Sequence, residues 1–157
     1  MLEQEQKIKT FEDSLLYAVE KTSMYYRIKG AQFFSNYEVT AEQFCVLEAL
    51  YYSQEEKVCQ RDISKKILKD RSNTGRLLNI LEEKRFVSRV VDTRQKRLVK
   101  MVSITQKGKE LYEKISPEIK KVFLKTLDGV SMEELDFVKN ILRKIRENLS
   151  KDITIQI

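Results

Sequence analysis

The sequence predicts a mainly α-helical chain with one small β-hairpin, an α+β fold. Three observations indicate this. Apolar residues recur every three to four positions through both halves of the chain, capping residues precede these runs, and one stretch alternates as a strand does. The 157 residues, with one proline, four glycines and no linker, suit one compact domain or a small domain with helical extensions.

Two helices are expected in the first third of the chain. The first covers residues 11–36 and is rich in aromatic side chains. Thr40 begins the second, because its hydroxyl can cap the first turn while Gln43 reaches back to complete a capping box. A polar turn at residues 53–57 ends this part.

Two short helices follow the turn. Residues 59–68 form the first, with Ile63 and Ile67 on its inner side. Asp70 then caps a second helix that ends near Lys84. The buried side of this second helix carries Leu77, Leu78 and Leu81.

The hairpin comes next, with strands at residues 86–91 and 99–104 around a polar, basic stretch. That stretch, residues 92–97, exceeds a tight turn, so a mobile tip is expected. Thr105 caps a further helix, which Pro117 should bend. Ser131 and Glu134 form a capping box that opens a final helix to about residue 149.

Positive charge is concentrated in residues 60–107. This stretch holds 14 Lys and Arg against 5 Asp and Glu, a net charge of +9; with +6 for the whole chain, the remainder carries −3. A basic block in a mildly acidic chain is the footprint of a polyanion site, although a solvated charged face explains the charge equally well.

Composition excludes several function classes. The chain has two cysteines and no histidine, which rules out a zinc finger and a histidine-based catalytic site. It also lacks a phosphate-binding loop and suitably paired acids, so neither an enzyme nor a cofactor is expected. No run approaches a membrane span and the N-terminus is polar, which predicts a cytoplasmic protein with no membrane partner.

Two short helices before a basic hairpin are typical of a winged helix-turn-helix, which binds duplex DNA. The second helix should read base edges through residues whose side chains suit them. They are Arg71, Ser72, Asn73, Thr74 and Arg76. Phosphate contacts are expected from the preceding helix and the wing. They are Arg61, Lys65, Lys66, Arg94, Lys96 and Arg97. Gly75, costly inside a helix, either lets the backbone approach DNA or is a neutral, well-packed glycine.

Residues 77–89, LLNILEEKRFVSR, followed by the wing and by SITQKG at 103–108, resemble the MarR family of bacterial transcription factors. The resemblance covers residues 11–149. The family's recognition helix ends in a Glu-Lys-Gly-like turn, where Arg85 replaces the usual glycine. Arg89 matches the arginine that follows this turn in the family. An Asp-x-Arg salt bridge holds the family's wing; Asp92-Thr93-Arg94 matches it in type, while Gln95-x-Arg97 lies closer to the family's position.

The resemblance implies a homodimer, most simply a repressor, on a pseudo-palindromic DNA site. Residues 1–38 and 108–157 would form the helical dimerisation region, and residues 39–107 the winged helix-turn-helix lobe. Independently, the aromatic first helix and the last two helices carry more apolar surface than a winged-helix core buries. A protein-interaction module is the alternative, but the outer face of the 70–84 helix is polar rather than apolar.

Family likeness also implies release of DNA by a small aromatic ligand. Six aromatic residues are candidates for lining its pocket, although at helical spacing they are equally core and dimer interface. They are Tyr17, Tyr25, Tyr26, Phe33, Tyr37 and Phe44. Cys59 replaces a usual Ser or Thr cap at a helix N-terminus near Arg61, so a redox-responsive regulator is a further alternative. Cys45 is expected to be inert packing.

Overall fold

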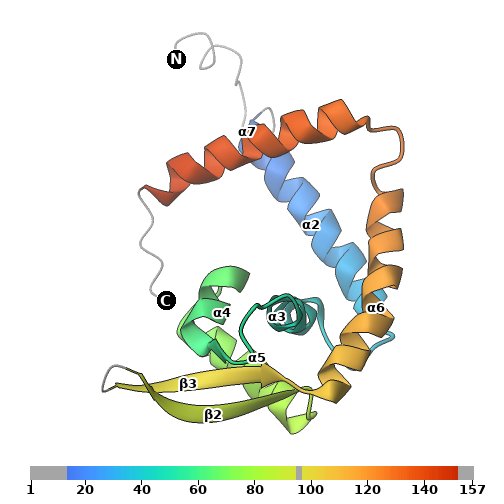
Figure 1. The fold of residues 1–157 in the computed structure, drawn as a ribbon. Coiled ribbons are helices and arrows are strands. Elements are labelled where there is room, and N and C mark those ends of the chain that lie inside the picture. Colours follow the sequence, from blue (N-terminus) through green and yellow to red (C-terminus); the bar gives the residue numbers. More distant parts are fainter. Residues whose placement is uncertain (1–13, 95–96, 152–157) are drawn as a thin grey trace. The chain divides into compact units, whose positions relative to one another are not determined.

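The computed structural model describes residues 14–94 and 97–151. They fall into two compact units, residues 1–41 and 42–157, each described by itself (Figure 1). The elements in chain order are α2 (Leu15–Phe34), α3 (Ala41–Tyr51), β1 (Val58–Cys59), α4 (Gln60–Ile67), α5 (Arg71–Glu83), β2 (Val87–Arg94), β3 (Arg97–Ile104), α6 (Gln106–Lys125) and α7 (Met132–Ser150).

Helix α2 is the main element of the first unit. It begins after Ser14, whose hydroxyl accepts a hydrogen bond from the Tyr17 amide at 3.1 Å, and it ends two residues before the predicted Asn36. The first residues of the predicted helix, 11–13, lie outside the described residues. Many apolar side chains of α2 are exposed, including Leu16 at 60 % and Tyr25 at 66 %.

A three-stranded antiparallel sheet of order β1-β3-β2 lies in the second unit. Strand β1 was not predicted, because two residues are too few to show alternation. It forms through pairing of Val58 with Val102 and of Cys59 with Met101.

The hairpin is longer than predicted, and the expected six-residue tip is wrong. Strands β2 and β3 pair from Val87 and Ile104 out to Arg94 and Arg97, so the connection consists of residues 95–96, which lie outside the described residues. Ladder hydrogen bonds join backbone groups, so pairing continues through polar side chains where the apolar alternation has ended.

The core of the second unit joins α3, α4, α5, the sheet and the first half of α6. The most completely buried side chains include Leu47, Ile63, Leu78, Leu81, Phe86, Met101, Val102 and Ile115. The predicted inner leucines of α5 are all buried. Phe44 of α3 stacks on Tyr112 of α6, with ring centroids 5.2 Å apart.

The two C-terminal helices begin at the predicted caps. Thr105 accepts a hydrogen bond from the Gly108 amide at 3.1 Å, and Ser131 and Glu134 complete a capping box. Helix α6 runs unbroken through Pro117. None of the 19 residues of α7 is buried, which distinguishes α7 from α3 to α6.

Candidate nucleic-acid interface

Helix α5 is oriented by its N-terminal turn. The turn from α4 passes through Leu68, which has a left-handed backbone with φ of 52°. Asp70 then accepts a hydrogen bond from the Asn73 amide at 2.8 Å, and its second oxygen accepts one from the Asn73 side chain. These bonds, the backbone one first, hold the pKa of Asp70 below its ordinary value. The cap therefore stays charged at neutral pH and favours the helix start.

Four of the five predicted base readers lie on the exposed side of α5: Arg71, Ser72, Asn73 and Arg76. The prediction for Thr74 is wrong. Its side chain is completely buried, because position 74 falls on the same helical face as Leu77, Leu78 and Leu81 at spacings of three, four and seven residues. Thr74 belongs to the interior of the lobe.

Gly75 faces the helix pair rather than the outside. A Cβ added there would lie 3.6 Å from the Gln60 side-chain nitrogen of α4 as its nearest neighbour. That is an ordinary packing distance. The position favours the interpretation of Gly75 as a neutral glycine over that of close approach to DNA.

The predicted phosphate contacts on α4 differ in their surroundings. Arg61 and Lys65 are exposed. Lys66 instead donates a hydrogen bond of 3.3 Å to the carbonyl of Ala49 in α3, so its ammonium helps to join α4 to α3. Lys69, which was not predicted, pairs with Glu42 of α3.

The wing is joined to α5 by an ion pair. Arg89 of β2 donates to Glu82 of α5 from Nε at 2.9 Å and also from its terminal nitrogen. Hydrogen bonding by Arg89, with its charge, lowers the pKa of Glu82. Glu82 was missed in the sequence. The signal was present in the Glu-Glu pair of the LLNILEEKRF segment, but which of the two faces the wing depends on the helix-to-strand turn.

The remaining predicted wing residues that the structure describes lie near the far end of the hairpin. Asp92 is exposed and accepts a hydrogen bond from the Thr93 amide at 2.7 Å. The backbones of Arg94 and Arg97 face each other at the end of the ladder. Lys96 lies outside the described residues. Lys100 of β3, missed among the expected phosphate contacts, is exposed on the wing.

The turn between α5 and β2 is closed around Arg85, which has φ of 62°. Its amide donates to the Glu82 carbonyl at 2.8 Å and the Phe86 amide to the Leu81 carbonyl at 2.9 Å. This is the Schellman pattern, in which glycine is preferred at the left-handed position. The backbone at Arg85 thus has the conformation expected for the glycine of the family pattern.

The aromatic and cysteine candidates are spread over the chain. Phe33 and Tyr37 are half-buried, with centroids 5.0 Å apart, while Tyr25 and Tyr26 are exposed on α2, and Tyr17 is half-buried there. Phe44 lies in the core, the alternative left open for it.

Neither cysteine stands out as a reactive site. Cys59 is half-buried at the start of α4 and makes no side-chain capping bond. Cys45, expected to be packed, is exposed at the surface. Partial burial first, then Glu48 and Glu42, raise the pKa of its thiol, which disfavours the reactive thiolate.

Known proteins resemble this chain in sequence and in fold. A model of the MarR family matches residues 37–98, from the end of the first unit to the wing. The structure of Staphylococcus aureus MepR in complex with DNA superposes with a TM-score of 0.78 at 26 % identity, over 89 % of this chain and 99 % of that one. Over residues 37–98 the chain is similar to the MarR family.

Two Bacillus subtilis regulators of helix-turn-helix type are similar to this chain. YwaE is 35 % identical over 50 % of this chain and 45 % of its own length, so that alignment spans less than half of YwaE. YybA is 25 % identical over 76 % of this chain and 77 % of its own length. These similarities confirm the predicted winged-helix fold and support the predicted resemblance to MarR-family regulators.

Within residues 14–94 and 97–151, no three His, Cys, Asp or Glu side chains gather as a metal-binding group. No helix among the described residues is long and apolar enough to cross a membrane.

Proposed function

We propose that this chain is a homodimeric, sequence-specific transcriptional regulator, most simply a repressor, that inserts α5 into the major groove of a pseudo-palindromic site. The observation that carries the proposal is the division of α5 into two faces. Leu77, Leu78 and Leu81 are buried, whereas Arg71 and Arg76 are exposed. An exposed basic and polar helix face after a tight turn suits base edges and phosphates.

The same face argues against a protein-interaction module. Such a module needs an apolar outer surface on this helix, and the exposed positions of α5 carry arginine, serine, asparagine and glutamate. Arg61, Lys65 and Lys100 add exposed positive charge from α4 and β3. The proposed phosphate contacts are these three residues together with the wing residues Arg94, Lys96 and Arg97.

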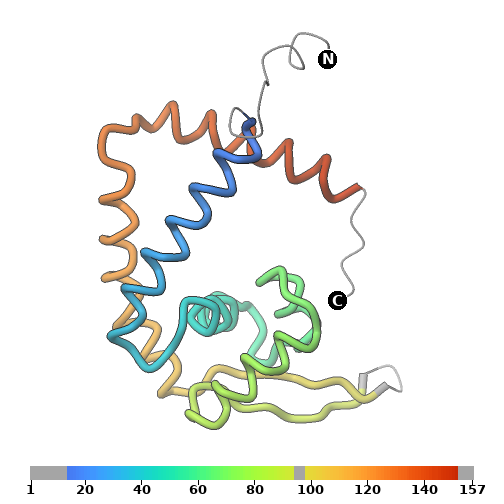
Figure 2. The backbone as a smooth tube through the Cα atoms, turned by 180° about the vertical axis from the view of Figure 1, so that it is seen from behind, coloured from blue at the N-terminus to red at the C-terminus, as the bar shows by residue number. Residues whose placement is uncertain are grey.

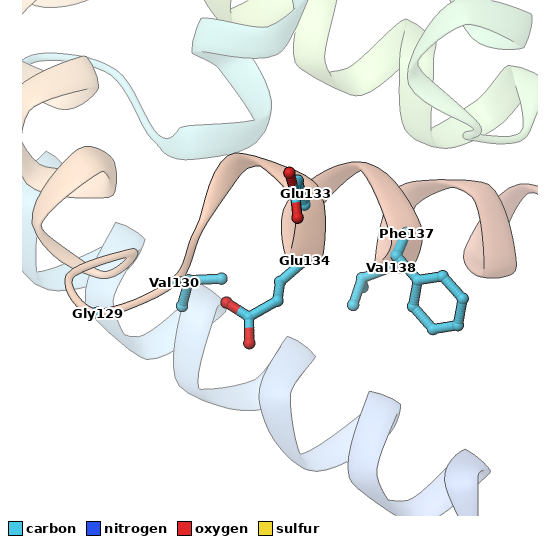
Figure 3. Close-up of a pocket in the computed structure, with 6 residues that line it drawn as sticks. All are labelled: Gly129, Val130, Glu133, Glu134, Phe137 and Val138. Atoms are coloured by element: carbon cyan, nitrogen blue, oxygen red, sulfur yellow. The ribbon is translucent and has the colours of Figure 1, made fainter.

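Dimerisation is proposed for the helical regions 1–38 and 108–157, because their apolar side chains lack cover. Helix α7 exposes Phe137 at 68 % and Val138 at 50 %. An amphipathic helix with no buried residue gains stability only when its apolar stripe is covered. An open apolar hollow of 610 Å³ lies at its start, where Val130, Glu134 and Val138 line one side (Figure 3).

Selection of bound duplexes from a random pool tests the DNA part of the proposal. An inverted repeat with half-site centres one turn apart, ~34 Å, is expected. Affinity for the selected duplex should fall steeply with salt, since each neutralised phosphate releases counterions. Weak, salt-independent binding to every duplex would contradict the proposal.

Sedimentation of two charge variants tests the dimer. Val138→Asp puts a charge on the apolar stripe of α7 and should shift the protein towards monomer. Asn140→Asp adds the same charge about 200° around the helix and should leave the dimer intact. Equal mass for both variants at low concentration would place the dimer contact elsewhere.

We assign no reaction to the chain, and we place its action in the cytoplasm because chromosomal duplex is its proposed partner. Release by a small aromatic ligand and redox switching at Cys59 remain predictions. Ligand titration against the bound duplex, and affinity of Cys59→Ser under oxidant, are the measurements that decide between them.

A further inference from the structure

One face of the β2–β3 hairpin carries an apolar stripe that begins in the core and is interrupted by Arg89 and Lys100. The register puts Val87, Arg89, Val91 and Thr93 of β2 on this face, opposite Ile104, Val102, Lys100 and Leu98 of β3. Val87 and Val102 at the base of the stripe are 2 % and 0 % exposed.

The stripe continues past the part of the lobe that covers it. Val91 is 64 % exposed and Leu98 is 79 % exposed. In both views the hairpin extends beyond α4 and α5 of the same unit (Figures 1 and 2). Arg89, on the same face, reaches Glu82 of α5, so the exposed end of the stripe lies on the side of the hairpin that faces the recognition helix.

Charge indicates what covers this end. Lys100 is exposed directly opposite Val91, while the acidic Asp92 belongs to the other face with Val90 and Val99. The surrounding stretch, residues 60–107, carries a net charge of +9. An apolar patch set in positive charge matches a nucleic-acid groove, whose sugar walls are apolar and whose rims are phosphates. It matches a second copy of this basic lobe poorly.

We propose that Leu98 and Val91 form an apolar contact surface, the wing patch, that packs on the deoxyribose walls of the groove entered by the wing. The proposal rests on the proposed DNA-binding function and adds a contact that is not electrostatic. Other DNA-binding proteins also bring apolar side chains into the minor groove, where they wedge between base steps. The wing then contributes shape-dependent affinity beside the salt-dependent affinity of its basic residues.

Salt titration of binding to the duplex selected by the wild-type protein tests the wing patch. Leu98→Ala should weaken binding about three- to tenfold, because part of an apolar contact is lost, and the slope of log affinity against log salt should stay unchanged. Lys100→Ala should instead reduce that slope by about one. Leu98→Ile should restore wild-type affinity, because the apolar contact is kept.

Val90→Ala is the matched control, since Val90 lies on the opposite face of the hairpin, in β2 next to Val91, and is 45 % exposed. It should bind as the wild type does. Unchanged affinity of Leu98→Ala, equal losses for Leu98→Ala and Val90→Ala, or a change in oligomeric mass with Leu98→Ala would each overturn the wing patch. Failure of the wild type to bind any duplex would instead remove the proposed function itself.

Discussion

The guanidinium of Arg89 in β2 is held by the carboxylate of Glu82 in α5, with the Nε–Oε2 distance at 2.9 Å. Two donors of one planar group meet the same carboxylate oxygen. The pair crosses the turn at Arg85 and fixes the base of the wing to the recognition helix. The pair therefore links the two proposed DNA-contacting elements directly.

Glu82→Gln should lower stability by about 0.5–1 kcal/mol at pH 7, since the pair is partly exposed. The folded-state pKa of Glu82 lies below its ordinary 4.5, so the contribution is full above that value and is lost as pH falls through the lowered one. Urea unfolding should show that the difference in free energy of unfolding between Glu82→Gln and wild type is smaller at acid pH than at neutral pH. Glu83→Gln is the control, and a gap that persists in acid contradicts the assignment.

Arg85→Gly should raise stability by about 0.5–1 kcal/mol. The left-handed conformation costs a non-glycine residue about 1–2 kcal/mol, and the added freedom of glycine in the unfolded chain offsets part of the gain. Thermal unfolding of Arg85→Gly and wild type measures this change in stability. Lys84→Gly, one residue earlier with φ of −78°, should lose stability, and a gain there as large as at Arg85 would refute the conformational reason.

Gly108→Ala should be severely destabilising, by about 3 kcal/mol or more. The added Cβ would lie 2.2 Å from the Phe86 carbonyl oxygen and 2.9 Å from Ile104 Cγ1. Gly75→Ala is the matched variant, because its Cβ has space, and it should gain about 0.5–1 kcal/mol from helix propensity. Chemical denaturation of both proteins gives the comparison; similar losses would show that the close approach at Gly108 does not matter.

Thr74→Val should stabilise the lobe by about 1 kcal/mol and leave DNA affinity unchanged. The Thr74 hydroxyl is buried with no hydrogen-bond partner among the described residues, and valine has the same shape. Ser64→Ala is the contrast, because the Ser64 hydroxyl donates to the Gln60 carbonyl at 3.1 Å, and it should lose stability. A drop in DNA affinity with Thr74→Val would return Thr74 to the base readers.

Local signals predicted most of the fold. Asp70, Thr105, Ser131 and Glu134 were identified as caps from residue type and spacing alone, because a cap depends on atoms three residues apart. The helix order, the hairpin and the exposed basic face of α5 follow from periodicity. The comparisons support the resemblance to the MarR family, which these features indicated, over residues 37–98.

The errors share a different cause. Strand β1 exists only because β3 lies beside it, and the length of the hairpin depends on ladder bonds that side-chain types do not report. Thr74 is the exception: its spacing of three, four and seven residues to the inner leucines is present in the sequence, but the prediction rested on its hydroxyl, which suits a base edge.

The sequence by itself determined the elements, their caps and the concentration of charge, since these depend on neighbours along the chain. Only the tertiary structure decided that Glu82 holds Arg89 and that Leu98 and Val91 share one exposed face. Each of these relationships joins residues through the packing of separate elements, and packing sets directions and distances that residue types alone leave open.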